Sequence, residues 1–275
     1  MFKQQSLSIA MAGILLTTVA LPALISTAHA TALPSAETVV SNINAVDEGE
    51  HVVRKLRMVM TDKRGKVRER LTTSYRKFFG DEKRSVLFYQ KPSNVKGTGF
   101  LTFDYKDPKV DDDQWLYLPA LRKVRRISAS DRGDYFLGTD MTYEDMKLEG
   151  KLEPADYHYK VLGLEQKNGQ SLLKMEGIPH SNVIARELGY GRVEFLVNQD
   201  NWVIQSSEYW GPKGKYLKSV MMSDIRQVNG IWTRHNIEAV NHKTGHKTLF
   251  EFSEVNYQTK VKDSLFRKNS LTRGR

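Results

Sequence analysis

The sequence predicts a mainly β protein built around one large, strongly curved antiparallel sheet. Three observations support this prediction. From His51 onward, β-branched and aromatic residues alternate with polar ones at period two, as in strands with one buried face. Gly, Asn, Asp and Pro interrupt these runs at short intervals, and such short connections favour antiparallel neighbours. Only two segments have helical periodicity. We therefore expect an N-terminal helix and a short helical lid, with about eleven strands in the rest of the chain.

The first 30 residues have the form of a secretory signal peptide. Lys3 supplies a positive start, an apolar run follows, and Ala28 and Ala30 end the segment in the A-x-A arrangement that signal peptidase accepts. A transmembrane anchor is the alternative, but the apolar run is short for a span of about 20 residues and contains Pro22. We therefore expect cleavage after Ala30 and a single mature domain over residues 31–275 in the periplasm.

Composition limits the classes of function. The chain contains no cysteine, so it can have neither disulfides nor an acyl anchor on a lipoprotein cysteine. A formal net charge of +10 would suggest nucleic acid as the partner of a cytosolic protein. An exported protein meets lipid headgroups, lipopolysaccharide and acidic protein faces instead, and no nucleic-acid partner is expected. A charge that serves solubility alone is an equally good explanation.

The N-terminal helix is predicted over "SAETVVSNINAVDEG". Ser35 is placed to cap its first turn, and Thr38 stands where a capping box has Glu. Gly49 follows the end of the segment, as expected for a helix stop. One apolar stripe would face the sheet, and it consists of Val39, Val40, Ile43 and Val46.

The predicted strands follow one another along the chain. "HVVRKLRMVMT" and "VRERLTTSYRKFF" open the series around the turn "DKRGK", and the second half repeats this pattern as far as "TLFEFSEVNY". Because alternating strands have one apolar face and one wet face, the curved sheet should close over something on its inner side. Two small helices are too little protein to fill that side, which indicates a cavity. Interleaved side chains that fill the space are the alternative.

The second helical segment is "GTDMTYEDMKLEG", in which Met141, Met146 and Leu148 lie between two glycines. Asp140 could cap this helix, and Glu144 and Asp145 could pair with nearby arginines. An acid/base pair is the alternative for these carboxylates, but no partner nucleophile is visible. The sequence contains neither G-x-S-x-G nor a P-loop pattern, and its composition excludes a cysteine nucleophile. We expect no catalysis and no cofactor.

Two further groups of polar residues contain side chains of the types that ligate metals. His242 and His246 have the spacing of a metal pair on a helix, but Gly245 and the flanking strands place them across a turn. The run of carboxylates at 111–113 lacks the glycine and the distal glutamate of an EF-hand loop, so a solvated turn is the better interpretation. No metal site is expected.

A specific combination of motifs occupies the middle of the chain. "NVKGTGFLTFDYKD" is followed by "WLYLPALRKVRRISASDRGDYFLGTDMTYEDM", which contains a W-x-Y-x-P hairpin, a basic strand and an F-x-G-x-D-x-x-Y-E-D segment. Over residues 92–150 the sequence resembles the outer-membrane lipoprotein-sorting-like proteins of the LolA/LolB superfamily, in particular the larger LolA-like branch associated with RND-type exporters. "DSLFRKNSLTR" is similar to the ending of that family. The resemblance implies a half-open β-barrel whose concave side, covered by helices, holds lipid or acyl chains.

These motif segments supply the candidate cavity residues. Strand alternation places Leu116 and Leu118 on one face of the hairpin and Trp115 and Tyr117 on the other. Ordinary core packing is the alternative for each candidate, although methionine suits a variable apolar guest because its flexible thioether can re-pack. The residues predicted to line the cavity are Leu101, Phe103, Leu116, Leu118, Phe136, Met141, Tyr143 and Met146.

The basic strand after the hairpin supplies the candidate polar contacts. Arg122, Arg125 and Arg126 could face a lipid headgroup or an acidic docking surface at the cavity rim, because a guanidinium pairs with two oxygens at once. Ion pairs with carboxylates of neighbouring strands, or of the "YED" segment, are the alternative.

The expected function is a soluble periplasmic carrier that binds a lipid or acylated molecule and transfers it between the inner and outer membranes. Burial of an acyl chain contributes about 0.8 kcal/mol per CH₂, hence on the order of 10 kcal/mol for 16 carbons. The expected partners are lipid or lipoprotein acyl chains and, by the resemblance, an RND-type inner-membrane transporter, with only peripheral membrane contact. The alternative is an interaction or sensor module that docks on a membrane transporter without carrying cargo.

Overall fold

The computed structural model describes residues 1, 32–107 and 109–273. The chain forms two units, Met1–Ala32 and Leu33–Arg275, and all the helices and strands described belong to the second. The predicted signal peptide and its cleavage site after Ala30 lie outside the described residues. No helix in the described part of the chain is long and apolar enough to cross a membrane.

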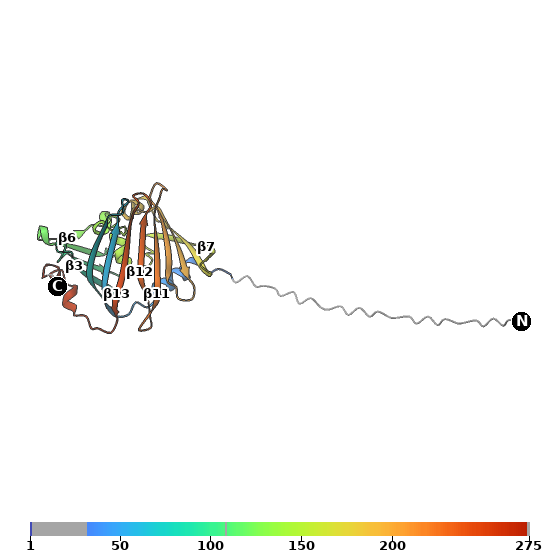
Figure 1. Ribbon diagram of the computed structural model, residues 1–275, viewed down its shortest axis with the longest axis horizontal. Coiled ribbons are helices and arrows are strands. Elements are labelled where there is room, and N and C mark those ends of the chain that lie inside the picture. Colours follow the sequence, from blue (N-terminus) through green and yellow to red (C-terminus); the bar gives the residue numbers. More distant parts are fainter. Residues whose placement is uncertain (2–31, 108, 274–275) are drawn as a thin grey trace. The chain divides into compact units, whose positions relative to one another are not determined.

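The described residues form one antiparallel sheet of thirteen strands, in the order β6-β5-β4-β3-β2-β1-β13-β12-β11-β10-β9-β8-β7 (Figure 1). The first six strands are β1 (His51–Thr61), β2 (Val67–Phe79), β3 (Glu82–Lys91), β4 (Gly99–Asp104), β5 (Asp113–Leu118) and β6 (Lys123–Ile127). The other seven are β7 (Tyr157–Lys167), β8 (Gln170–Pro179), β9 (Arg192–Asn198), β10 (Ile204–Trp210), β11 (Tyr216–Val228), β12 (Ile231–Asn241) and β13 (His246–Asn256).

The predicted half-open antiparallel architecture is confirmed, with thirteen strands rather than about eleven. Sequence neighbours pair from β1 to β6 and from β7 to β13, and these two halves join where β1 pairs with β13. β6 and β7 are the two edges, and they do not pair with each other, so the barrel stays open between them. Short hairpin connections explain this order, because they force each strand beside the one before it.

The segment that joins the two edge strands returns across the concave side. It contains the short helices η2 (Ala129–Asp131), η3 (Phe136–Gly138) and α2 (Tyr143–Leu148). Phe136 and Tyr143 belong to the same buried cluster as Leu56 and Met58 of β1, so this lid packs on the inner face of the central strands. Figure 1 shows it in green behind the sheet.

The N-terminal helix is confirmed as α1 (Ala36–Ala45). The Ser35 side chain caps it by accepting a hydrogen bond from the Thr38 N–H at 3.2 Å. Val39, Val40 and Ile43 are buried against the concave side of the sheet.

The second helix is capped differently from the prediction. Thr142, not Asp140, is the N-cap of α2, and it forms a capping box with Asp145. Asp140 instead accepts hydrogen bonds from Thr248 Oγ1 at 2.7 Å and pairs with His246 Nδ1 at 2.5 Å. The carboxylate is thus bound to β13, which leaves the capping position to the next hydroxyl along the chain.

The expectation of only two helices is wrong for the described residues. α3 (Asn182–Leu188) connects β8 to β9 and begins at a cap formed by Ser181. It has seven residues, too few for a full 3.6-residue periodic pattern to emerge between two strands. Near the C-terminus, η4 (Asp263–Phe266) and α4 (Ser270–Arg273) follow the last strand, and η1 (Pro119–Leu121) joins β5 to β6.

Two separate apolar clusters lie on the two faces of the sheet. The large one fills much of the concave side, and the smaller one lies on the other face of β3, β4 and β5. The C-terminal segment covers the smaller cluster with Val261, Leu265, Phe266 and Leu271. The predicted alternation in the hairpin is confirmed, since Leu116 and Leu118 pack with the concave cluster and Trp115 and Tyr117 with the other.

Candidate functional site

A cavity of about 130 Å³ remains on the concave side of the sheet. One water molecule requires about 10–15 Å³ of such space, so the cavity has room for on the order of ten. Exposed lining residues, Asp47 and Trp232, mark where it reaches solvent. The apolar part of the wall comes from α1, α2 and strands on both sides of the β1–β13 pair, and it includes Ile43, Leu56, Leu87, Phe100, Met141, Met146, Trp202, Val203, Ile204, Met222, Ile237, Phe250 and Phe252.

The eight predicted lining residues divide into three groups. Met141 and Met146 of the lid segment line the cavity. Leu116, Leu118, Phe136 and Tyr143 belong to or pack against the concave cluster, but they lie behind the cavity wall. Leu101 and Phe103 do not line it, because the register of β4 turns Phe100 inward and turns these two towards Trp115 on the opposite face. Ligand contact by the inward-facing residues stays a prediction.

The three predicted polar contacts lie on or next to the edge strand β6, away from the cavity wall. Arg125 pairs with Asp131 at 2.9 Å, and Arg126 pairs with Asp113 at 2.6 Å. Arg122 is exposed in the turn before β6 with a left-handed backbone. Arg126 therefore makes an ion pair of the kind that was the alternative prediction, with a carboxylate of the neighbouring strand, whereas the partner of Arg125 lies in η2. Contact of these arginines with a headgroup or a partner stays a prediction.

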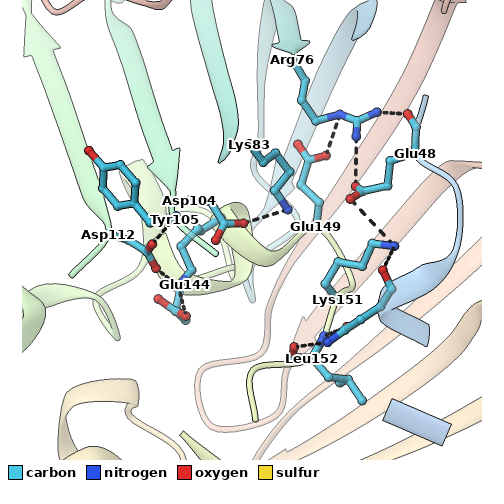
Figure 2. A network of polar contacts seen from close by, with 12 residues as sticks. Glu48, Arg76, Lys83, Asp104, Tyr105, Asp112, Glu144, Glu149, Lys151 and Leu152 are labelled. Atoms are coloured by element: carbon cyan, nitrogen blue, oxygen red, sulfur yellow. Dashed lines mark hydrogen bonds and ion pairs between the residues drawn. The ribbon is translucent and has the colours of Figure 1, made fainter. Parts of the chain in front are cut away.

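The cavity has a charged side that is formed by other residues. Arg54 and Arg76 lie on neighbouring strands, where Arg54 stands opposite Ser74 and Arg76 stands opposite Val52. Both point to the concave face. Arg54 Nη2 donates to Glu149 Oε1 at 2.5 Å, and Arg76 Nε lies 4.0 Å from Glu149 Oε2. Figure 2 shows the Glu149 side chain directed towards Arg76.

Two further cations complete this charged side. Arg234 of β12 donates to the backbone carbonyl of Glu149. Lys151 Nζ donates a hydrogen bond of 2.6 Å to the backbone carbonyl of Val46, the C-cap residue of α1. This bond satisfies an acceptor that the helix leaves unpaired. Glu48 lies between Lys151 and Arg76, with its Oε2 3.8 Å from Nζ and its Oε1 3.2 Å from Arg76 Nη1 (Figure 2).

We call Glu48, Arg54, Arg76, Glu149, Lys151 and Arg234 the cationic cluster. Four cations and two carboxylates leave a formal charge of +2. Burial by itself raises the pKa of Glu149, but Arg54, Arg76, Lys83 and Arg234 outweigh it and lower the pKa to about 2. Burial lowers the pKa of Lys151 to about 8, and neighbouring cations reinforce this effect against the attraction of Glu48. The lowered pKa of Glu149 thus follows from the surrounding positive charge, whereas the lowered pKa of Lys151 follows chiefly from burial.

Some of the donors in this cluster are unused. The side chain of Arg76 is only 3% exposed, yet its Nε has no hydrogen-bond partner within the described residues, and its Nη1, which forms an ion pair with Glu48 Oε1 at 3.2 Å, makes no well-aligned hydrogen bond. Arg54 Nε likewise has no hydrogen-bond partner within the described residues. Buried donors are normally satisfied, so each of these atoms requires an explanation. All of them belong to side chains that line the cavity.

A second hollow of about 450 Å³ lies between β4, β6 and the lid, and it differs in its charges. Lys147 pairs with Asp112 at 2.5 Å and with Glu144 at 2.8 Å. Arg132 pairs with Asp156 at 2.7 Å. Among the described residues that line it there are eight carboxylates and six cations, so this hollow has an excess of negative charge, opposite in sign to that of the cationic cluster.

Sequence reasoning missed the cationic cluster. Arg54 could have been found, because it occupies the face of β1 that otherwise carries Val52, Leu56 and Met58. Arg76 follows Thr72 and Ser74 along its own strand, and such a polar face resembles a solvent-facing one. Glu149 and Lys151 follow the lid helix in irregular structure, where no periodicity marks them.

Comparisons with known proteins agree on one kind of architecture. A family model described as an uncharacterized protein matches residues 81–273. The chain is 28% identical to a protein domain from Vibrio parahaemolyticus that is named for outer membrane lipoprotein sorting, with a TM-score of 0.77 over 86% of this chain and 97% of that one. It is 27% identical to a DUF1329 family protein from Desulfovibrio piger, with a TM-score of 0.78 over 85% of this chain and 96% of that one.

A third structure shares the fold at lower identity. A LolA superfamily protein from Nitrosomonas europaea is 18% identical, with a TM-score of 0.65 over 86% of this chain and the whole of that one. Comparison with curated proteins finds no match.

Proposed function

We propose that this chain is a periplasmic carrier for a lipid or an acylated molecule. The chain belongs to the family whose model matches residues 81–273, and it has the LolA-like fold. The cavity on the concave side would hold the acyl part of the cargo. The name of the Vibrio parahaemolyticus relative, which refers to lipoprotein sorting, supports a role of this type. Transfer between the inner and outer membranes, with an RND-type transporter as the inner-membrane partner, is part of the proposal and is supported by the resemblance of the motif segments.

The observation that carries the proposal is the apolar wall of the cavity. A buried sheet face normally fills its space with its own side chains, because packing in protein interiors is as dense as in organic crystals. Here, aliphatic, aromatic and methionine side chains instead surround about 130 Å³ of open space. Met141, Met146 and Met222 contribute flexible side chains that can adapt to an apolar guest.

The proposal is tested by isolating the protein after export of the full chain and extracting it with organic solvent for mass spectrometry. We expect a lipid in about stoichiometric amount. An empty extract, together with no uptake of a fluorescent fatty acid by the purified protein, would contradict the carrier function and favour a docking module.

A matched pair of variants tests whether binding occurs in this cavity. Met222 of β11 lines the cavity, while its neighbour Met221 is 50% exposed on the other face. We expect Met222→Trp to weaken fatty-acid uptake at least about tenfold, because the larger side chain fills the space. Met221→Trp should bind as the unmodified protein does. Equal uptake by both variants would place the binding site elsewhere.

A further inference from the structure

An acylated cargo has a polar head group as well as an acyl chain. The charges on the cavity wall indicate which kind of head group would bind there. The charged side of this wall is the cationic cluster, in which four cations face two carboxylates. The other charged lining residues reduce this excess by at most one charge, that of Asp47. Asp145 pairs with the buried Lys218 at 2.6 Å, and Asp47 is exposed and accepts the Gly49 N–H.

The cluster is also adjacent to the apolar wall. The Arg54 guanidinium lies 4.6 Å from the ring centroid of Phe252, and both residues line the cavity. A molecule with one end at Phe252 and the other at Arg54 would therefore need an apolar part and an acceptor part close together. That is the chemistry of an amphiphile.

The buried donors without a hydrogen-bond partner indicate the charge and the chemical type of the head group that the cavity would bind. Arg76 is almost fully buried, its Nε has no hydrogen-bond partner within the described residues, and its Nη1 is held only by the ion pair with Glu48 at 3.2 Å. A buried donor without an acceptor is costly, and an oxyanion is the strongest acceptor for a guanidinium. A carboxylate or phosphate in the cavity would both accept these hydrogen bonds and compensate the excess charge.

We propose, on the basis of the proposed carrier function, that the cationic cluster binds the oxyanion of an anionic amphiphile whose acyl chain occupies the apolar part of the cavity. A free fatty acid would supply a carboxylate, and a phospholipid would supply a phosphate. A neutral acylated molecule could offer ester or hydroxyl oxygens to the donors of Arg54 and Arg76, but it would leave the excess positive charge of the cluster uncompensated.

The structure provides a readout for this test, because Trp202 and Trp232 both line the cavity. The protein is isolated after export of the full chain and is stripped of lipid. Its tryptophan fluorescence is then followed during titration with three ligands that share a twelve-carbon chain. Laurate carries a carboxylate, dodecyl phosphate carries a phosphate, and 1-lauroylglycerol is neutral. We expect at least one of the two anions to bind ten- to a hundredfold more tightly than the neutral ligand, as about one to two charge-assisted hydrogen bonds would produce. Which anion binds more tightly distinguishes a fatty acid from a phospholipid as the source.

Substitutions of single cations test which residues cause the preference for an anionic ligand. Arg54 and Arg57 both lie on β1, but Arg54 faces the cavity while Arg57 is exposed and pairs with Glu69. Arg54→Gln and Arg76→Gln should remove the preference for the anion and leave the affinity for 1-lauroylglycerol unchanged. Arg57→Gln should preserve the preference. If Arg76→Gln does not fold, Arg54→Gln and Lys151→Gln provide the same comparison.

The outcomes separate this inference from the function on which it rests. Equal binding of all three ligands, or a preference that survives in Arg54→Gln and Lys151→Gln, would overturn the anionic head and leave the carrier function intact. Binding of none of the three would contradict the carrier function itself.

Discussion

Glu149 holds together the charged side of the cavity. Its carboxylate contacts Arg54 and lies near Arg76, and its backbone carbonyl accepts a hydrogen bond from Arg234. Arginines that are taken out of water are tolerated only beside an opposite charge, because desolvation of an unpaired charge costs several kcal/mol. A single carboxylate at the end of α2 thus joins strands β1, β2 and β12 to the lid.

Replacing this carboxylate should destabilise the protein. We expect Glu149→Gln to lower the free energy of unfolding by about 3 kcal/mol at pH 7, because it leaves buried cations without their partner. Urea unfolding measures the change. Glu69→Gln is the control, since its pair with Arg57 is half exposed and should contribute less than about 1 kcal/mol. Equal losses in the two variants would contradict this role of Glu149.

The same carboxylate makes a prediction about pH. The pKa of Glu149 falls from its ordinary value of 4.5 to about 2 on folding. A depressed pKa means that the ionised form stabilises the native state, so the contribution is complete above about pH 4.5 and is lost as the pH falls towards 2. The difference in stability between the unmodified protein and Glu149→Gln should therefore shrink over this interval and be constant between pH 5 and 7.

At the scale of elements, the lid is fastened to the sheet through a second buried ion pair. Lys218 of β11 is fully buried, and its Nζ contacts Asp145 at 2.6 Å and the Asp140 carbonyl at 3.0 Å. Tyr190 donates a hydrogen bond to the same Asp145 oxygen at 2.8 Å. Asp145 also completes the capping box of α2, so one carboxylate both starts the helix and attaches it to the sheet.

Removal of this lysine should loosen the lid. We expect Lys218→Met to cost about 3 kcal/mol of stability, since it leaves Asp145 without its cation in a buried position. Hydrogen exchange measured by mass spectrometry should become faster over residues 140–150, and this increase in rate should be larger there than in β1 and β2. Lys213→Met, at an exposed turn, is the control and should stay within about 0.5 kcal/mol. Unchanged exchange in the lid of Lys218→Met would show that other contacts fasten it.

At the scale of the folded domain, the sheet separates two apolar clusters with different roles. The concave cluster surrounds the cavity, whereas the other is closed by the C-terminal segment. Phe266 is fully buried there, with its ring centroid 5.6 Å from that of Phe79. The C-terminal segment therefore contributes to stability from the face opposite the candidate site.

This separation can be tested with one substitution. We expect Phe266→Ala to lower the free energy of unfolding by about 3–5 kcal/mol, because it removes a ring from a packed cluster. Fatty-acid uptake by the folded fraction should stay the same, since the cavity lies on the other face. Leu121→Ala, at a residue that is 63% exposed, is the control and should change stability by less than about 0.5 kcal/mol. A loss of uptake in folded Phe266→Ala would show that the two faces are coupled.

The sequence by itself determined the strands, their antiparallel order and the cap at Ser35, because these depend on residues close together in the chain. Alternation at period two marks a buried face, and short turns leave each strand only its neighbour to pair with. Within the candidate site, the family resemblance of the motif segments pointed to Met141 and Met146, and both residues line the cavity.

Only the tertiary structure decided which face of each strand lines the cavity and which charges meet there. Leu101 and Phe100 are adjacent and both apolar, so their sequence does not distinguish the concave side from the side under the C-terminal segment. Arg54 and Glu149 are 95 residues apart and come together through the return of the lid across the sheet. The physical reason is that a buried charge is stable only beside its partner, and that partner is set by long-range packing rather than by the local pattern.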